Sequence, residues 1–315
     1  FTGMVWNGDF TTEIHPDFAS SGIRMLSTPD SLHKNVTIKG LTLVRIGSNA
    51  EHGGLLDALE DCDFDIKILS DGAAFGGALG ISPFFPENRP SKNVNAKLRC
   101  TNGGNFGLQY GNVSGGEMEV INEGTQREAL GLEPYALGKQ DVSTITSDTI
   151  SWVSHGMVTG DPVIYSAQGS TVIAGLVNGR FYFAVKIDDD SVKLASSTEQ
   201  AWIADIISLG SVTGTQRFYR AGLLENILVK GVRSSVIGVV SGGSSTGVII
   251  ATATSGGFHR NVRIKGVASV LDNDVSGSQN INIVGANGVI VSDVDIMGAE
   301  TVGVQVNRGF LQGVK

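Results

Sequence analysis

Residues 128–135 bring together the side chains of this sequence that could do chemistry. Glu128 and Glu133 lie in this stretch, and Asp57 ends an earlier, looser copy of its pattern. A pair of carboxylates catalyses glycoside hydrolysis, about 5 to 5.5 Å apart for retention and about 6.5 to 9.5 Å apart for inversion. We therefore treat Glu133, Glu128 and Asp57 as candidate catalytic residues and place Glu133 first.

Elimination from a uronic acid is the alternative chemistry for the same stretch. It needs a base, such as Tyr135, and a cation, such as Arg127, that neutralises the substrate carboxylate. Polar residues at the matching positions of earlier copies would edge a site for an extended glycan. The candidate substrate-binding residues are Gln109, Arg127, Tyr135 and Ser82.

The pattern of this stretch, apolar residue, glycine, apolar residue, polar residue, returns along the chain. Its polar endings at positions 57, 82, 109 and 133 are 24 to 27 residues apart. Short strands that recur about every 20 to 30 residues predict a parallel β-solenoid, in which each repeat stacks on its neighbours. The endings at 82 and 109 close the copies at 79–82 and 106–109, and further copies stand at 237–240 and 302–305.

A second repeat alternates apolar and polar residues in the way of a strand. Three close copies stand at 34–43, 225–232 and 260–267, and each begins with a charged residue followed by an asparagine. Weaker copies stand at 62–68 and 92–98. Side chains alternate across a strand, so Val36 and Ile38 should point inward and Thr37 outward. The asparagine before each strand favours a left-handed turn residue.

Stacking of the first repeat predicts two columns on the solenoid surface. If Leu130 and Leu132 face the core, Gly131 and Glu133 face outward, and a glycine column beside a polar column would form a shallow trough for a glycan. The alternative is that the glycines relieve crowding at a bend or a subunit contact. Asp57 and Glu133 would be about 14 Å apart, so Glu133 needs a nearer acid, which could be Glu128, Glu123 or Glu117.

The repeats break off in one segment and are absent from the first residues. Residues 141–220 contain strands with turn residues between them, including a hairpin turn at Asp188, Asp189 and Asp190, and they predict a small inserted β-barrel or β-sandwich. Residues 1–30 show no clean period and predict an irregular lead-in or cap. The predicted solenoid covers 31–140 and 221–315.

Composition limits the partners. The net charge of −8 disfavours nucleic acid and anionic membranes, although a local basic groove would still admit an acidic polysaccharide. The acidic run from Glu60 to Asp65 lacks the glycine and terminal glutamate of a calcium loop, so we interpret it as a charged outer strand face. Cys62 and Cys100 are interpreted as buried thiols. We expect no metal and no other cofactor.

Two resemblances follow from these patterns. The pattern H-G-x-x-T-G-D-x-V-x-Y at 155–165 resembles a β module of phage tail proteins and large bacterial adhesins. The two-strand, glycine-rich repeats resemble the right-handed parallel β-helix of phage tailspikes and, more distantly, of pectate lyases and mannuronan epimerases. The Y-G-x-D-P-H-E signature of the epimerases is absent. The resemblance implies an all-β fold, a single-stranded right-handed parallel β-helix with an inserted domain.

The tailspike resemblance also implies a function and partners. It implies a protein of the phage virion tail, or an extracellular one, that binds and depolymerises a bacterial surface polysaccharide as a glycoside hydrolase or lyase. The alternatives are a non-enzymatic receptor-binding or structural tail or adhesin protein and, third, a free lyase or epimerase. It implies a homotrimer, for which the outward apolar positions of Leu55, Val240, Ile249 and Ala251 also argue. Because the chain begins at Phe1, we expect other tail proteins to bind through missing termini.

Overall fold

The structure is a computed structural model of the chain. It describes residues 3–14, 23–25, 33–45, 53–70, 78–81, 90–101, 106–125, 128–236, 246–251, 257–271, 279–284, 289–297 and 302–307. Over these ranges the regular secondary structure is almost entirely β-strand, with one short helix, which confirms the prediction of an all-β fold with large parallel sheets. None of the described residues forms a helix with the length and apolar character needed to cross a bilayer. The chain divides into two compact units, unit 1 (Phe1–Pro134, Leu223–Ala253 and His259–Lys315) and unit 2 (Tyr135–Gly222 and Thr254–Phe258).

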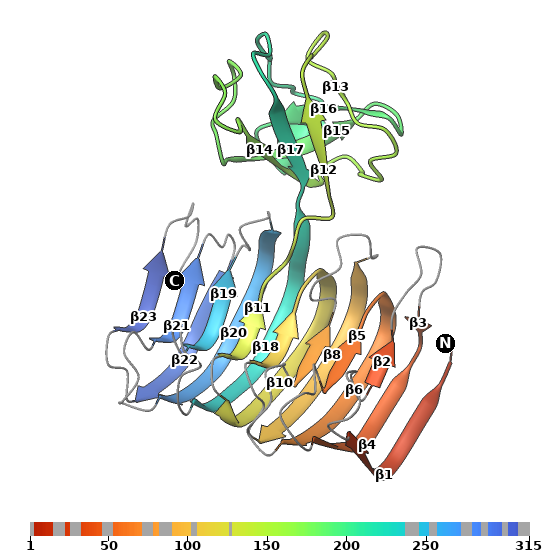
Figure 1. The fold of residues 1–315 in the computed structure, drawn as a ribbon, viewed down its shortest axis with the longest axis vertical. Helices are drawn as coiled ribbons and strands as arrows, with labels where there is room; N and C mark the ends of the chain where they lie inside the picture. Colours follow the sequence, from red (N-terminus) through yellow and green to blue (C-terminus); the bar gives the residue numbers. More distant parts are fainter. Residues whose placement is uncertain are drawn as a thin grey trace. The chain divides into compact units, whose positions relative to one another are not determined.

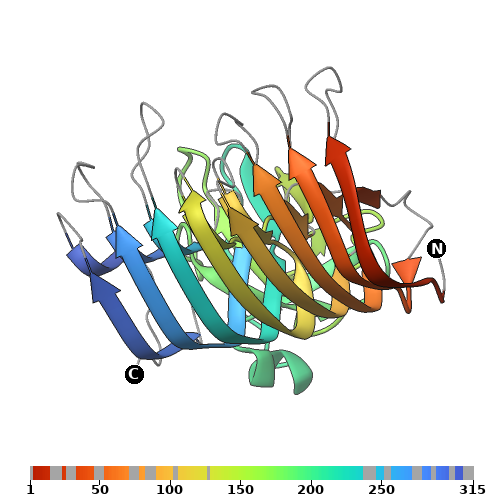
Figure 2. The same ribbon diagram turned by 90° about the horizontal axis from the view of Figure 1, so that it is seen from below.

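Unit 1 contains two parallel sheets, and, apart from one two-residue strand, strands that follow one another within the unit belong alternately to one sheet and the other (Figure 1). In each sheet the strands follow one another in chain order, and the strands of sheet A lie side by side with their arrows pointing the same way (Figure 2). Sheet A consists of β1 (Val5–Ile14), β4 (Thr37–Arg45), β6 (Leu59–Ser70), β8 (Ser91–Thr101), β10 (Val113–Thr125), β18 (Gly222–Val236), β20 (Gly257–Leu271) and β22 (Val289–Met297), with β3 (His33–Lys34) paired to β6. Sheet B consists of β2 (Ile23–Met25), β5 (Gly54–Leu56), β7 (Leu79–Ile81), β9 (Phe106–Tyr110), β11 (Glu128–Leu132), β19 (Thr246–Ala251), β21 (Gln279–Val284) and β23 (Val302–Asn307).

Stacked apolar rows form the core of unit 1. Because the strands of sheet A pair in register, residues at matching positions of neighbouring strands form rows across the sheet. Every second residue of a strand points inward, so alternate rows face the interior. One such row is Ile38, Phe64, Ala96, Met118 and Val229, all at most 4% exposed. The inward and outward assignment predicted for the second repeat is therefore confirmed.

Left-handed residues occur where asparagines were predicted to adopt this conformation, but only Asn35 precedes its strand, and the others lie within the first five residues of strands of sheet A. A side chain that hydrogen-bonds locally is one of the few that tolerate this backbone region. Asn93 Nδ2 donates to Asp61 Oδ1 at 2.9 Å, and Asn261 Nδ2 donates to Asn226 Oδ1 at 2.8 Å, so the side chains also link neighbouring strands. The φ values are 53° at Asn35, 55° at Asp61, 50° at Asn93, 54° at Asn226 and 51° at Asn261.

Two expectations about unit 1 need correction, and a third falls outside the described residues. The prediction of an irregular segment at 1–30 is wrong for β1 and β2. The register of β1 against β4 shifts between Asn7 and Phe10, which breaks the period of two that would have marked the strand. Leu55 is only 6% exposed, so it adds no apolar surface for a trimer contact. The copy predicted at 237–240 lies outside the described residues, and β19 pairs with β11 instead.

Unit 2 is built on a single antiparallel sheet with its own core. The core includes Trp152, Tyr165, Phe218 and Leu194, and Tyr165 and Phe218 have ring centroids 5.2 Å apart. The order of the sheet has β12 and β13 at its two ends, which differs from the expected closed barrel or two-sheet sandwich. The elements are β12 (Gly138–Val142), β13 (Ile150–Ser151), β14 (Pro162–Ser166), β15 (Phe181–Lys186), β16 (Ser191–Ala195), β17 (Gln216–Arg220) and α1 (Thr198–Trp202). The hairpin predicted around Asp188 to Asp190 joins β15 to β16.

Candidate functional site

The structure brings two of the sequence-predicted site residues into contact. Gln109 of β9 donates from Nε2 to Oε2 of Glu133 at 3.0 Å, and Glu133 follows β11, the next strand of sheet B. Gln109 is 2% exposed, whereas Glu133 is half-buried. A glycan could therefore meet Glu133 more easily than its glutamine partner.

The other predicted site residues fall into different surroundings. Glu128 and Asp57 are 3% and 2% exposed, so neither offers a carboxylate to solvent. Asp57 Oδ1 accepts the backbone N–H of Ala58 at 2.9 Å, and Ala58 has a φ of 48°, which gives Asp57 a turn-forming role. Tyr135 is the first residue of unit 2. The predicted contacts Ser82 and Arg127 lie outside the described residues.

The predicted glycine trough is wrong. Gly80 pairs with Gln109, and Gln109 pairs with Gly131, so a glutamine separates two glycines that were expected to share a column with Gly107. Gly80, Gln109 and Gly131 are all buried. A Cβ at Gly107 would lie 1.9 Å from Nδ2 of Asn122 and 2.3 Å from the carbonyl oxygen of Ala129. The glycine at 107 therefore allows close packing rather than access for a ligand.

A groove of about 230 Å³ lies instead on the outer face of sheet A, and we call it the sheet A groove. Its floor is the row of β6, β8 and β10 residues that turn their side chains into the core. Its walls are polar residues on the flanking outward rows, contributed by five neighbouring strands. The lining residues are Lys39, Asp63, Phe64, Asp65, Asn95, Ala96, Lys97, Glu117, Met118, Glu119 and Lys230.

Contacts between strands fix one wall of the sheet A groove. Asn95 Nδ2 donates to Asp63 Oδ1 at 2.8 Å, and Asn95 Oδ1 accepts the backbone N–H of Glu117 at 3.0 Å. The carboxylate of Glu117 also forms an ion pair with Lys230. Because each strand holds the next through a side chain, these polar groups keep a fixed spacing of about 4.8 Å.

The second wall alternates in charge from strand to strand. Lys39 pairs in register with Asp65, Asp65 with Lys97, and Lys97 with Glu119. Lys97 Nζ lies 2.8 Å from Glu119 Oε2. Among the described residues, Lys39 and Asp65 have no ion-pair partner within 4.0 Å. Asp63 has no ion-pair partner among them either, but it accepts a hydrogen bond from Asn95. The groove therefore offers the ammonium group of Lys39 and the carboxylate of Asp65 to a ligand without loss of a side-chain hydrogen bond or ion pair to another described residue.

Sequence reasoning missed the sheet A groove because its residues are unevenly spaced. Asp63 and Asn95 are 32 residues apart, and Asn95 and Glu117 are 22 apart. The signal that could have found it was the second repeat, whose outward positions carry Lys39, Asp65, Lys97 and Glu119 once the inward residues are aligned. Alignment on the glycine repeat of sheet B drew attention to the buried face instead.

The acidic run that begins at Glu60 forms the charged outer strand face that was predicted. Asp61 is exposed and Asp63 and Asp65 are half-buried, while Cys62 and Phe64 between them are buried. Burial also raises the pKa of the Cys62 thiol, in line with an unreactive core cysteine. Within the described ranges, no group of three or more His, Cys, Asp or Glu side chains is placed to hold a metal ion.

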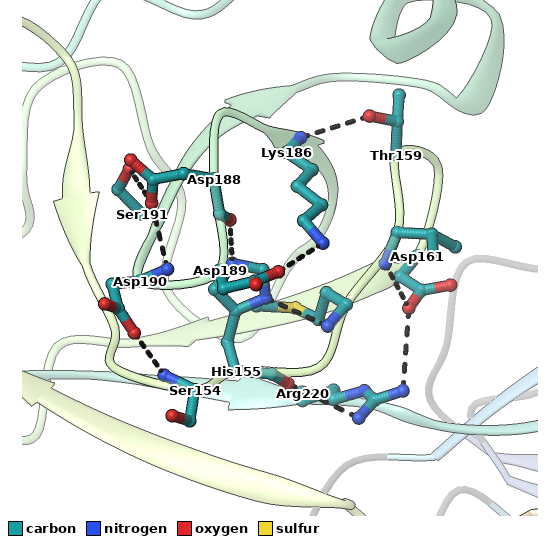
Figure 3. A network of polar contacts seen from close by, with 12 residues as sticks. Ser154, His155, Thr159, Asp161, Lys186, Asp188, Asp189, Asp190, Ser191 and Arg220 are labelled. Atoms are coloured by element: carbon teal, nitrogen blue, oxygen red, sulfur yellow. Dashed lines mark hydrogen bonds and ion pairs between the residues drawn. The ribbon is translucent and has the colours of Figure 1, made fainter.

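Unit 2 has a polar network of a different kind, centred on His155 (Figure 3). His155 is 4% exposed, and its Nδ1 accepts the backbone N–H of Met157 at 2.9 Å. That bond assigns the proton to Nε2, which donates to the carbonyl oxygen of Asp188 at 2.9 Å. Asp190 Oδ1 accepts the backbone N–H of Ser154 at 2.8 Å. The histidine and aspartates thus pin the β15–β16 turn to the segment before β14.

The remaining members of this network are also engaged within unit 2. The hydroxyl of Ser191 and the backbone N–H of Asp190 hold the pKa of Asp188 below its usual value. Lys186, at 2.7 Å from Asp189, lowers the pKa of that carboxyl in the same way. Arg220 lies 3.7 Å from Asp161 and donates to the carbonyl oxygen of His155. The polar side chains of the H-G-x-x-T-G-D pattern therefore hold the β15–β16 turn against the segment before β14, and their role is in folding.

Neither of the comparisons with known proteins gives the chain a relative. No protein-family model matches it, and no curated protein matches it.

Proposed function

We propose that unit 1 is a right-handed parallel β-helix of the phage tailspike or tail-fibre type, and that it binds a bacterial surface polysaccharide. The β-helix is supported by the order of strands, which move between sheet A and sheet B and advance by one position in each. A right-handed path is supported by the strong preference of parallel strand crossovers for that hand. The left-handed asparagines fit a bend that recurs near the start of the sheet A strands from one coil to the next.

The sheet A groove carries the functional part of this proposal. It crosses adjacent strands and presents carboxylate, amide and ammonium groups at a regular spacing. A sugar ring is roughly as long as one strand spacing, so consecutive sugars of a polymer could each meet one strand. Asp65 would accept a hydrogen bond from a hydroxyl group, and Lys39 would donate one.

Hydrolysis is the second candidate activity, because Glu117 and Glu119 stand two residues apart on β10. Side chains two apart share a strand face with a backbone separation of roughly 6.6 Å, near the carboxylate spacing of inverting glycosidases. Both are paired with lysines, Glu117 with Lys230 and Glu119 with Lys97, whereas a general acid must carry a proton. Binding without cleavage is therefore the first proposal.

A homotrimer and a place in the virion tail belong to the same proposal. They follow from the tailspike resemblance of the repeats, and the exposed apolar side chains of Ile290 and Val294 on β22 give a small area that a neighbouring subunit could cover. Glu133 with Gln109 stays the candidate for a second, less accessible glycan contact. Sedimentation of the whole chain tests the trimer without reference to a substrate.

A panel of bacterial surface polysaccharides tests the function. The chain is incubated with each polymer, and binding by calorimetry, new reducing ends and unsaturated products are measured. Binding without new ends supports the first proposal, and new reducing ends support hydrolysis. Lys39→Met should weaken binding about tenfold, whereas Lys265→Met should leave it unchanged. Lys265 precedes Gly266 as Lys39 precedes Gly40, and both glycines have positive φ, but Lys265 does not line the groove.

A further inference from the structure

The charges that line the sheet A groove nearly cancel. Lysines at 39, 97 and 230 face four carboxylates, at 63, 65, 117 and 119, which leaves a formal charge of −1. The four carboxylates of the groove thus outnumber its three ammonium groups. The sheet A groove itself is therefore not the basic groove that an acidic polysaccharide would need.

The order of these charges matters as much as their sum. Along one wall the signs alternate from Lys39 to Asp65 to Lys97 to Glu119 over four neighbouring strands. A chain with a negative charge on each sugar would meet a carboxylate at every second strand. Repulsion between like charges in such contacts costs affinity and selects against that partner.

We infer that the ligand of the sheet A groove is an uncharged, hydroxyl-rich glycan and not a polymer of uronic acids or other acidic sugars. The inference rests on the proposed function and narrows its substrate class. Hydroxyl groups both donate and accept, so they match a surface that alternates acceptors such as Asp65 with donors such as Lys39. Neither group needs a charged partner from the ligand.

The inference also decides between the two chemistries considered for the chain. Elimination requires a uronic acid, because the carboxylate of the sugar makes the neighbouring proton removable and a protein cation must neutralise it. Lys97 and Lys230 are already paired with glutamates in the groove, so Lys39 is the one lysine of its lining without an ion pair to a described residue, and Asp65 lies beside it in register. A neutral ligand leaves hydrolysis as the one bond-breaking reaction that this face could support.

A polysaccharide of uronic acids and its carboxyl-reduced form provide the test. The two polymers share linkage and length and differ only in charge, and binding of the whole chain to each is measured at low and high ionic strength. We expect the reduced, neutral form to bind at least about tenfold more tightly, with an affinity that changes less than about twofold with salt, since uncharged ligands escape screening. Asp65→Asn should weaken binding of the neutral form and strengthen binding of the acidic form.

The outcomes separate the inference from the proposed function. Tighter binding of the acidic form, with an affinity that falls as salt is raised, overturns the inference and leaves glycan binding intact. The same holds if Asp65→Asn weakens binding of both forms equally. If neither form nor any polymer of the panel binds, or if Lys39→Met and Lys265→Met bind alike, the groove is not a glycan site and both proposals fail.

Discussion

Units 1 and 2 use their polar side chains differently, although both are all-β. In unit 1 the polar contacts of sheet A lie on the outer face and link strands that are far apart in the sequence, such as Asp63 with Asn95. In unit 2 the central polar contacts are those of the buried His155, with Met157 two residues away and with Asp188, which is about as distant along the chain as Asn95 is from Asp63. Unit 1 depends on backbone fit and apolar rows, while unit 2 depends on side-chain hydrogen bonds.

This difference explains why we place function in unit 1. A polar group that holds a fold together cannot be given to a ligand without loss of stability, because a buried partner would be left unsatisfied. Exposed ion pairs contribute little to stability and can exchange partners at small cost. The sheet A groove is made of such pairs. Unit 2 also has solvent-accessible ion pairs, Lys186 with Asp189 and Arg217 with Asp141. The hydrogen bonds of its buried His155 fix a turn, so we expect substitutions at that residue to affect folding first.

Gly116→Ala should have the largest effect on stability, because it adds a Cβ where the backbones of two neighbouring strands of unit 1 lie close together. Gly116 has a φ of 132°, and a Cβ there would lie 2.0 Å from the carbonyl oxygen of Val94. Strain and overpacking together should cost about 4 kcal/mol. Hydrogen exchange of β8 and β10 peptides measures the loss. Gly169→Ala in unit 2 is the control, since its φ is 79° but nothing lies within 4 Å, and a cost equal to that at Gly116 would contradict the packing argument.

Acid should destabilise unit 1 through His259. This histidine is fully buried, its Nε2 donates to the carbonyl oxygen of Leu132 at 2.9 Å, and its Nδ1 has no hydrogen-bond partner among the described residues. Burial lowers its pKa from 6.5 to about 4. The unfolded chain therefore takes up a proton below pH 6.5 that the folded chain refuses until about pH 4. Stability should fall by about 3 kcal/mol across that window.

Chemical denaturation of the whole chain at several pH values checks the effect of His259, with hydrogen exchange of peptides from β11 and β20 as the local readout. His259→Leu removes the titrating group and is the matched variant. Its stability at neutral pH should be lower or equal, but its slope between pH 6.5 and 4 should be shallower than that of the parent chain. Parallel slopes in the two proteins would contradict the assignment.

The sequence predicted the strands of unit 1 better than their partners. Inward apolar positions such as Val36 and Ile38, and the left-handed asparagines, follow from local sequence, because side-chain alternation and turn preference act within a few residues. The pairing of Gly80 with Gln109 depends instead on how loops of unequal length return the chain to the sheet. The sheet A groove was missed for that reason, and only the Gln109–Glu133 contact of the predicted site was found.

Two tyrosine substitutions compare the units with the same chemical change. Tyr165 of unit 2 donates to Oε1 of Gln216 at 2.5 Å and accepts the backbone N–H of Ile173 at 2.9 Å. Tyr110 of unit 1 donates a single bond, to the carbonyl oxygen of Val94 at 2.7 Å. Both rings are fully buried. Tyr165→Phe should cost about 2 kcal/mol and Tyr110→Phe about 1 kcal/mol, because the first leaves two buried groups unsatisfied. Hydrogen exchange measures the loss in each unit, and equal losses of hydrogen-exchange protection in the two variants would contradict the comparison.

Substitutions at the ion pair of Lys97 and Glu119 should have the smallest effect on stability. The two side chains are 35% and 42% exposed, so water screens their attraction, and each single change should shift the free energy of unfolding by less than about 0.5 kcal/mol. A double-mutant cycle of Lys97→Met and Glu119→Gln measures their coupling, which we expect to be below about 1 kcal/mol.

The same two substitutions should have a large effect on glycan binding. Each variant should bind the glycan about tenfold more weakly, because both side chains line the groove. Arg99→Met on β8 is the control, since Arg99 is exposed on the same strand but does not line the groove. A large loss of stability with unchanged binding would mean that unit 1, like unit 2, uses its polar side chains for folding, and the reason for placing the ligand on sheet A would be gone.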